Sequence, residues 1–380
     1  MKTFIEFDAV ELPDHLQVTR ERVREFLQRE YLPNKSRFEG SFNPEFSRLC
    51  GEAGYIGMTW PKQYGGAEKS FLERYIVCEE MLAAGAPVWA HWVADRQSGS
   101  VLLAYASEEI KQNLIPKMVA GECYFCIGLS EPDSGSDLFA AKASAKECSE
   151  GWALNGTKLW TSGARQAHYM IALMRTDKPT EENRRHGLTQ FLVPMDTPGI
   201  TVRPVRNMAG DSEFNEVHFD NVIIPSGNAL GEINGAWKQA SKELAYERSG
   251  SERFLEIFSV LQALANYVHK NPKIHLQEAL GRLVADLYSF RQMSLSVAMM
   301  LERGKAPMVE AALVKDVATL WQQALPERVR SIVGGESDFG DQHQLRGEID
   351  YMLKLAPKLT IQGGTTEVLR GIIARGLGLR

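Results

Sequence analysis

One carboxylate, Glu247, stands out because its neighbours at helical spacing are mostly apolar. If residues 243–264 form one helix, a single face carries Leu244, Glu247, Ser251, Phe254, Phe258 and Leu261. A carboxylate on such a face is costly to bury unless it is paired, hydrogen-bonded or facing a cavity. Burial would raise its pKa, which suits a general base working near neutral pH. The alternative is an ion pair with Arg248 or another basic group.

Two segments nearer the N-terminus hold groups suited to binding a cofactor. The turn GLSEPDSGSD, residues 128–137, crowds glycines and hydroxyls behind a predicted strand, where backbone N–H groups can bind an anion. A surface turn of this composition explains it equally well. In KLWTS, residues 158–162, a Trp precedes two hydroxyls, which fits one face and one edge of an aromatic ligand. A Trp taken alone is more often part of the core.

A third candidate lies near the C-terminus. Gly363 and Gly364 precede Thr365, which could cap the final helix. Backbone amides at such a helix start can bind a phosphate or a polarised carbonyl. A plain glycine hinge before a helix explains the pattern equally well.

The predicted secondary structure that must position these groups changes twice along the chain. Residues 1–122 show helical periodicity, residues 123–235 are rich in short β patterns, and residues 236–380 are helical again. These ranges are the three expected domains. Asn155-Gly156 between alternating residues predicts a hairpin turn, residues 273–304 predict one long helix, and Pro326 should kink or divide the next helix.

Composition narrows the class of protein. The chain has 380 residues, 44% of them hydrophobic, and a net charge of −5 without a basic stripe, so nucleic acid is not an expected partner. Five cysteines at irregular spacing favour a reduced, cytoplasmic protein, and the Cys123–Cys126 pair lacks the second pair of a metal site. The start of the chain predicts no signal peptide, and no run of roughly 18 apolar residues predicts a membrane span. Dinucleotide-fold, P-loop and serine-hydrolase motifs are absent from the sequence.

Four segments taken together resemble the acyl-CoA dehydrogenase family. They are LSEPDSGSD at 129–137, KLWTS at 158–162, FNEVHFDNVIIP at 214–225 and IQGGTTEVLRGIIARGLGL at 361–379. The resemblance implies an α+β, mostly α fold with an N-terminal helical domain, a central β-sandwich or barrel domain and a C-terminal four-helix bundle. It also implies FAD as cofactor, α,β-dehydrogenation of an acyl-CoA to the trans-2-enoyl-CoA, an electron-transfer flavoprotein as acceptor, and a homo- or hetero-oligomer, dimer or tetramer.

The resemblance also implies roles for single residues. Glu247 stands before Arg248 as the helix-borne base does in one branch of the family, and Gly363 would polarise the thioester carbonyl through its N–H. Arg248 and Ser136 would contact substrate. The groups expected to bind FAD are Leu129, Ser130, Gly135, Ser136, Trp160, Thr161, Ser162, Thr365 and Glu367.

The sequence departs from the family pattern in two places. The usual Arg-x-x-Phe-Gly is absent from HKNPKIHLQEALGRL at 269–283, and the usual Gln-x-x-Gly-Gly-x-Gly is altered to RSIVGGESDFGD at 330–341. This pattern is similar to heteromeric acyl-CoA dehydrogenases that act on steroid side chains. The substrate could therefore come from fatty-acid, branched-acyl or sterol side-chain catabolism. A flavin oxidase or monooxygenase of the same fold, a subunit with an incomplete FAD site, and a scaffold without turnover remain alternatives.

Overall fold

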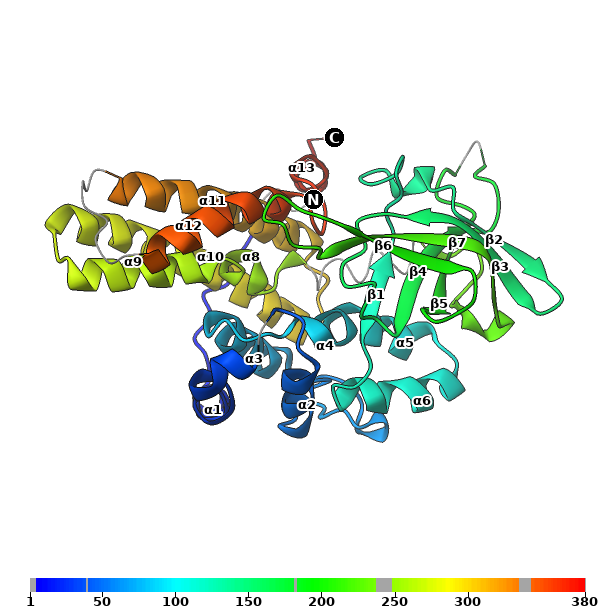
Figure 1. Cartoon of the computed structure of the whole chain (residues 1–380), viewed down its shortest axis with the longest axis horizontal. Helices are drawn as coiled ribbons and strands as arrows, with labels where there is room; N and C mark the ends of the chain where they lie inside the picture. The colour runs from blue at the N-terminus through cyan, green and yellow to red at the C-terminus, as the bar shows by residue number, and fades with distance from the viewer. Residues whose placement is uncertain (1–4, 39, 181–182, 237–247, 335–342, 380) are drawn as a thin grey trace. The chain divides into compact units, whose positions relative to one another are not determined.

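The computed structural model describes residues 5–38, 40–180, 183–236, 248–334 and 343–379. The chain divides into two compact units (Figure 1). A helical unit combines residues 1–35, 70–86 and 244–380, and a β unit combines residues 36–69 and 87–243. Compactness is a different criterion from a change of secondary structure, so the three sequence-based domain limits stay a prediction.

The helical unit is built on a bundle of long helices. Its described helices are α1 Asp14–Phe26, α3 Phe71–Ala83, α8 Glu252–Leu255, α9 Phe258–Lys270, α10 Ile274–Glu302, α11 Met308–Val333, α12 His343–Leu355 and α13 Thr366–Gly376. Helices α9 to α12 pack against one another side by side (Figure 1). Their facing positions form one buried apolar core, which includes Leu264, Leu283, Trp321, Leu325 and Ile349. Apolar residues at three- and four-residue spacing produce this arrangement.

A buried carboxylate ties the first helices to the bundle. Glu79 on α3 is 6% exposed. It accepts from Arg20 Nη2 of α1 at 3.0 Å and from Arg291 Nε of α10 at 2.6 Å. Charge-assisted bonds of this kind satisfy a carboxylate that would otherwise be costly to bury. They fix α1, α3 and α10 relative to one another.

In its described residues the β unit combines four α-helices of 5 to 12 residues with one sheet. The helices are α2 Pro44–Glu52, α4 Trp89–Val93, α5 Gly99–Tyr105 and α6 Glu108–Val119. The strands are β1 Phe125–Gly128, β2 Ser144–Cys148, β3 Gly151–Lys158, β4 Tyr169–Arg175, β5 Leu188–Pro194, β6 Ile200–Val205, β7 Phe214–Ile224 and β8 Ala229–Leu230. Within the described chain the strand order is β6-β7-β3-β2-β4-β5-β8, and β1 pairs in parallel with β4. The sheet core includes Leu154, Met170, Phe191, Val217 and Phe219.

The order of helices, then strands, then a helical bundle confirms the predicted fold class, and α10 confirms the predicted long helix. Two local predictions were wrong: a hairpin turn at Asn155-Gly156 and a division of the helix at Pro326. The kink expected at Pro326 as the other possibility stays a prediction. Asn155-Gly156 is not a hairpin turn but lies inside β3, where the register with β7 shifts. A Cβ on Gly156 would come within 2.6 Å of the Ala143 side chain, so the glycine serves close packing. Helix α11 runs through Pro326 as one element.

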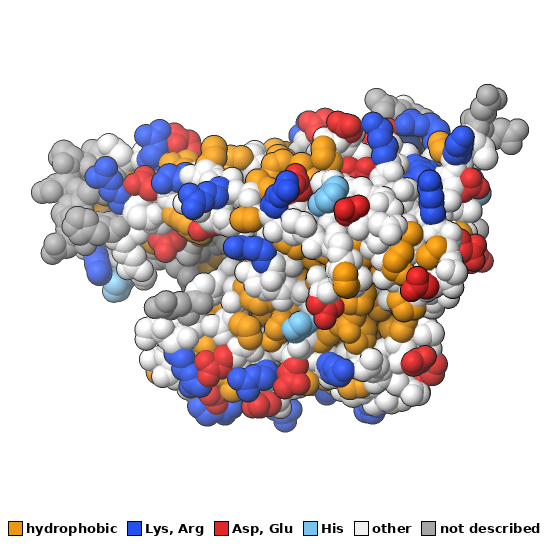
Figure 2. All heavy atoms as spheres, turned by 45° about the vertical axis from the view of Figure 1, so that its right-hand side comes forward, with side chains coloured by type: hydrophobic (Ala, Val, Ile, Leu, Met, Phe, Trp, Pro, Cys, Tyr) orange, Lys and Arg blue, Asp and Glu red, His pale blue; other side chains and the backbone are white. Residues whose placement is uncertain are grey.

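Charged side chains of both signs are interspersed over the face drawn in Figure 2. Among the described residues, no helix is both long and apolar enough to cross a membrane. Nor do the described histidines, cysteines and acidic residues gather in a group of three that could hold a metal ion.

Candidate functional site

The glycine- and serine-rich turn after β1 is held from inside by the carboxylate of Glu131. Glu131 is 7% exposed. Its Oε2 accepts the Lys142 N–H at 2.7 Å, and its Oε1 accepts the Ala143 N–H at 3.1 Å and Lys158 Nζ at 2.7 Å. These bonds connect Glu131, at the start of the turn, to residues 142 and 143, which follow the turn. The turn therefore has a fixed base and an exposed tip.

The exposed tip contains Gly135 and Ser136. Both are open to solvent, and a Cβ built on Gly135 would meet nothing within 4 Å. Beneath them, Ser134 Oγ donates to the Asp137 carbonyl at 2.8 Å and rigidifies the turn. Exposed backbone N–H groups on a rigid turn are suited to binding an anion such as a phosphate.

Lys158, at the end of β3, joins this turn to the KLWTS segment. Its side chain is fully buried and also donates to the Leu129 carbonyl at 3.3 Å. One residue on, the Leu159 N–H donates to the Ser130 carbonyl at 2.9 Å. Burial lowers the pKa of Lys158, and the adjacent Glu131 carboxylate opposes that shift. The buried pair thus holds residues 129–131 and 158–160 side by side.

Trp160 presents its indole to the outside of the β unit. It is 56% exposed, and its backbone has a positive φ of 61°. The ring of Phe214 meets it edge-on, with 6.0 Å between centroids. A non-glycine residue with positive φ is uncommon and costs energy, which points to a functional constraint. An uncovered indole braced at its edge can stack on a flat ligand.

The two hydroxyls after Trp160 differ in their surroundings. Thr161 is 1% exposed, and its backbone exchanges hydrogen bonds with Asn215, N to O, at 3.0 Å in both directions. Its Oγ1 is buried with no hydrogen-bond partner among the described residues. Ser162 is partly exposed. Of the two hydroxyls, Ser162 is the one open to a ligand outside the β unit.

In the helical unit, the double-glycine turn leads into α13. Gly363 has φ 72° and Gly364 has φ 110°, conformations that favour glycine. Thr365 is the N-cap of α13, and its hydroxyl accepts the Val368 N–H at 3.4 Å, which confirms the predicted cap. Glu367 lies exposed in the first turn, where its own N–H and the Thr365 side chain lower its pKa.

Two side chains from distant elements contact the carbonyls of this turn. Arg248 is 4% exposed, and its Nε donates to the Gly363 carbonyl at 3.4 Å. Lys315 Nζ, from the middle of α11, donates to the Gly364 carbonyl at 2.8 Å. Glu247, the residue before Arg248, lies outside the described residues. Arg248, which bonds the turn, is thus the residue next in sequence to the candidate base.

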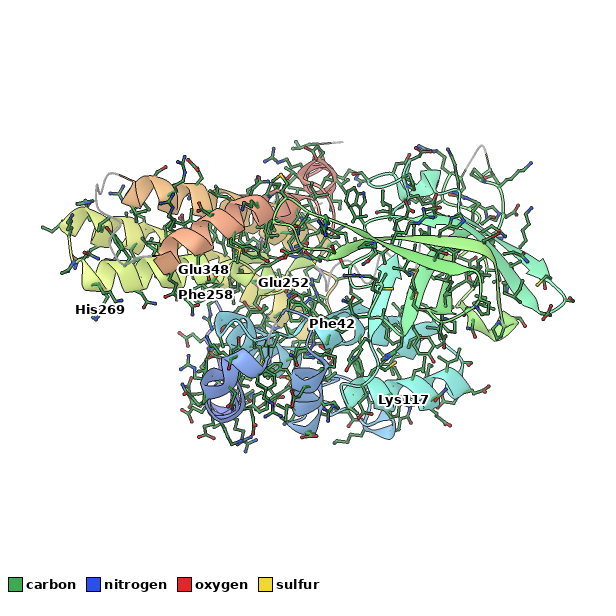
Figure 3. All side chains as sticks on the ribbon, viewed as in Figure 1. Phe42, Lys117, Glu252, Phe258, His269 and Glu348 are labelled. Carbon is green, nitrogen blue, oxygen red and sulfur yellow. The ribbon has the colours of Figure 1, made fainter. Side chains whose placement is uncertain are left out.

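The single helix predicted for residues 243–264 was wrong in its described part. Helix α8 covers only Glu252–Leu255, and α9 starts at Phe258 (Figure 3, where Glu252 and Phe258 are labelled). Between them Ile257 has φ −115° and ψ 29°, which is not helical. The Ile257 N–H donates instead to Gln322 Oε1 of α11 at 3.1 Å, and Gln322 Nε2 donates to the Glu252 carbonyl at 3.1 Å. Two hydrogen bonds to the Gln322 side chain thus take the place of helical backbone hydrogen bonds at this point.

The structure adds Glu131, Lys158 and Lys315 to the candidate residues. The first two stand inside the quoted segments LSEPDSGSD and KLWTS, but nothing in the sequence shows that they pair. Lys315 carries a weaker signal, since it follows the apolar run Ala311–Val314 and directly precedes Asp316. A buried lysine inside an apolar helix stretch needs a partner.

Comparisons with known proteins decide the family. Models of the acyl-CoA dehydrogenase N-terminal, middle and C-terminal domains match residues 13–122, 126–222 and 236–378. The chain belongs to the acyl-CoA dehydrogenase family. It is an oxidoreductase of that class, and members of the family are FAD-dependent flavoproteins.

Several relatives of this acyl-CoA dehydrogenase have names or structures. Acyl-CoA dehydrogenase FadE34 of Mycobacterium tuberculosis is 31% identical over 335 residues, covering 86% of this chain and 45% of the relative. The chain thus spans about half the length of that relative. Acyl-CoA dehydrogenase IpdE1 of Mycolicibacterium smegmatis is 31% identical over 349 residues, covering 86% of each protein. The solved Tcur3481-Tcur3483 steroid ACAD matches with TM-score 0.86 and 26% identity over 97% of this chain and 99% of that one.

Proposed function

We propose that the chain oxidises an acyl-CoA to the trans-2-enoyl-CoA with its own base, Glu247. The Glu247 carboxylate takes the α-proton of the thioester. The Gly363 N–H donates a hydrogen bond to the thioester carbonyl and stabilises the negative charge that develops on its oxygen. FAD held by Trp160 and by the turn around Gly135 and Ser136 would supply the acceptor for the β-hydride, so that loss of the α-proton and the β-hydride would leave a carbon–carbon double bond.

The observation that carries this proposal is the Arg248–Gly363 contact. The two residues are 115 positions apart, yet Arg248 Nε reaches the Gly363 carbonyl at 3.4 Å. This contact brings Arg248, the residue next in sequence to the proposed base, to the turn that carries the carbonyl-binding N–H. Arg248 itself is proposed to orient Glu247 and the thioester. A base and an oxyanion donor on one unit are what proton abstraction next to a carbonyl requires.

The groups of the β unit fit FAD on features of the unit itself. The uncovered indole of Trp160 suits the flat ring system, and the exposed amides around Gly135 and Ser136 suit its phosphates. Backbone groups of Leu129 and Ser130 and the hydroxyl of Ser162 are proposed as contacts to the ring edge. Ser136 is proposed to contact substrate as well, and Thr365 and Glu367 complete the proposed cofactor set. Thr161, which was expected in that set, is buried and bonded to Asn215, so we propose that it supports the segment from within.

The substrate class is proposed from relatives and from the missing motif. The steroid ACAD structure is 26% identical to this chain. We propose a branched, long or sterol-derived acyl group, with electrons leaving to an electron-transfer flavoprotein. The start of α10 reads IHLQEALGRL and lacks Arg-x-x-Phe-Gly. That absence favours a second candidate, a subunit of a heteromer in which another chain completes the FAD site.

A spectrum of the purified chain followed by anaerobic titration tests this proposal. We expect bound flavin, or flavin binding after a partner chain is added. We also expect bleaching of the flavin band by a branched or sterol-side-chain acyl-CoA and not by a short straight-chain one. A chain that binds no flavin in either state, or whose flavin no acyl-CoA bleaches, contradicts the proposal. Rapid reoxidation in air after bleaching would indicate an oxidase instead.

A further inference from the structure

The double-glycine turn does not fix its own shape. Gly363 and Gly364 both have positive φ, a region in which glycine moves freely because it lacks a Cβ. A Cβ on Gly364 would find no atom closer than 3.6 Å, so packing alone does not confine that residue. The direction of the Gly363 N–H therefore depends on the hydrogen bonds that hold the peptide units on either side of it.

Lys315 supplies one of these bonds, although burying its amine costs free energy of hydration. It is fully buried in the middle of α11, between Ala311, Val314 and Ala318, each 0% exposed. An apolar residue would be easier to accommodate there, since a buried amine must recover its lost hydration through bonds. Its Nζ donates to the Gly364 carbonyl at 2.8 Å, the shorter of the two contacts to the turn.

The two contacts act on successive peptide units. Arg248 bonds the Gly363 carbonyl and Lys315 bonds the Gly364 carbonyl, from separate elements of the same unit. Fixing these two planes leaves φ and ψ of Gly363 as the angles that orient its N–H, and Gln362 on the other side is held by its own N–H, which donates to the Lys358 carbonyl at 3.1 Å. The Thr365 cap holds the far end of the turn. The Gly363 N–H is then pre-aimed, as an oxyanion donor must be.

We propose that Lys315 is a positioning residue for thioester-carbonyl recognition, acting through the Gly363–Gly364 turn. This inference rests on the proposed function, in which the Gly363 N–H binds the thioester carbonyl. Lys315 itself touches neither substrate nor cofactor. Its role is to keep the N–H aimed at the place where the carbonyl oxygen becomes negative.

The test compares two ligands that differ only at the carbonyl. One is an acyl-CoA with two methyl groups on the α-carbon, which has no α-proton to lose, and the other is the thioether of CoA with the same chain. We expect the wild-type protein to bind the thioester more tightly than the thioether. In Lys315→Met the thioester preference should fall by about 10-fold while thioether binding is unchanged, since one aimed donor is worth about that much or more. For a true substrate, kcat should fall far more than KM rises.

A matched control lies on the same helix. Gln323 Nε2 donates to Thr360 Oγ1 at 3.2 Å, so it ties α11 to the segment before the turn without touching the glycine carbonyls. Gln323→Met should keep the thioester preference. Hydrogen exchange of a peptide covering residues 360–366 should speed up in Lys315→Met and not in Gln323→Met. If Lys315→Met does not fold, Lys315→Gln, which keeps an N–H donor without the full length, is measured in its place.

The outcomes separate the two proposals. A wild-type protein that binds thioether and thioester alike, and whose flavin no acyl-CoA bleaches, overturns the proposed function and this inference with it. A wild-type protein that prefers the thioester, with a Lys315 variant that keeps the full preference and the same hydrogen exchange, overturns the role of Lys315 alone.

Discussion

Lys158→Met should destabilise the β unit strongly, because it leaves a buried carboxylate without its cation. Lys158 is fully buried, and without it Glu131 would keep the two backbone N–H donors of Lys142 and Ala143. Removing one partner of a buried ion pair costs about 3–5 kcal/mol. For a unit of this size each kcal/mol shifts the unfolding midpoint by roughly 2–4 °C, so we expect a fall on the order of 10 °C.

The same turn offers a matched control. Lys142 Nζ lies 3.3 Å from Asp133 Oδ2, and both side chains are more than three-quarters exposed. Lys142→Met removes the same type of group by the same substitution but should cost only about 0–1 kcal/mol. The double variant Glu131→Gln/Lys158→Met should recover part of the loss, since the amide that replaces the Glu131 carboxylate is uncharged and can still accept a backbone N–H.

Scanning calorimetry gives the midpoints, and hydrogen exchange of residues 128–143 locates the effect. The flavin should also be lost at a lower temperature, because Lys158 holds the Leu129 carbonyl beside the segment that carries Trp160. Equal midpoints for Lys158→Met and Lys142→Met, with unchanged exchange in this segment, would refute the reasoning.

Three further predictions concern other parts of the chain. Trp160→Ala should weaken FAD binding by about 0.5–1.5 kcal/mol, roughly a 2- to 10-fold rise in Kd by fluorescence titration, and an unchanged Kd would exclude stacking. Gly364→Ala should cost about 1–3 kcal/mol by denaturant titration, because φ 110° strains any side chain, and a neutral change would mean that the turn relaxes freely. Burial raises the pKa of the Cys123 thiol from 9.0 to about 12. The contribution of this thiol to the free energy of unfolding is therefore full below pH 9 and is lost as the pH rises to 12. Cys123→Ala should reduce the loss of stability over that range, and in native protein a thiol reagent at about pH 8 should modify exposed Cys148 before Cys123.

The sequence could predict what local pattern dictates. Helix α10 follows from a long stretch without proline in which most residues favour helix, and the Thr365 cap follows from a hydroxyl before the last periodic segment. Residue type and spacing also singled out the turn after β1 and Trp160 as candidates, but a Trp taken alone is more often part of the core, and its 56% exposure came from the structure.

The rest depends on partners far apart in the sequence. The helix break at Ile257 exists because Gln322 of α11 takes its N–H, and no pattern near Ile257 shows that. Helix α11 continues past Pro326, which is buried, whereas a proline in the sequence alone predicts a break or a kink. The pairing of Glu131 with Lys158 joins residues 27 positions apart. The motifs identified the segments 129–137 and 158–162, but they did not show that a carboxylate of one pairs with an amine of the other.

The role of Glu247 in removing the α-proton is tested most directly by flavin reduction in Glu247→Gln. The variant is mixed rapidly and without oxygen with an acyl-CoA that bleaches the flavin band of the wild-type protein. The account predicts retained flavin and retained acyl-CoA binding, with flavin reduction slower by about 10²–10⁴-fold. Glu252→Gln, a control at a carboxylate 4% exposed in the same stretch of chain, should reduce its flavin within a few-fold of the wild-type rate. Reduction of the Glu247→Gln flavin at the wild-type rate would contradict the account.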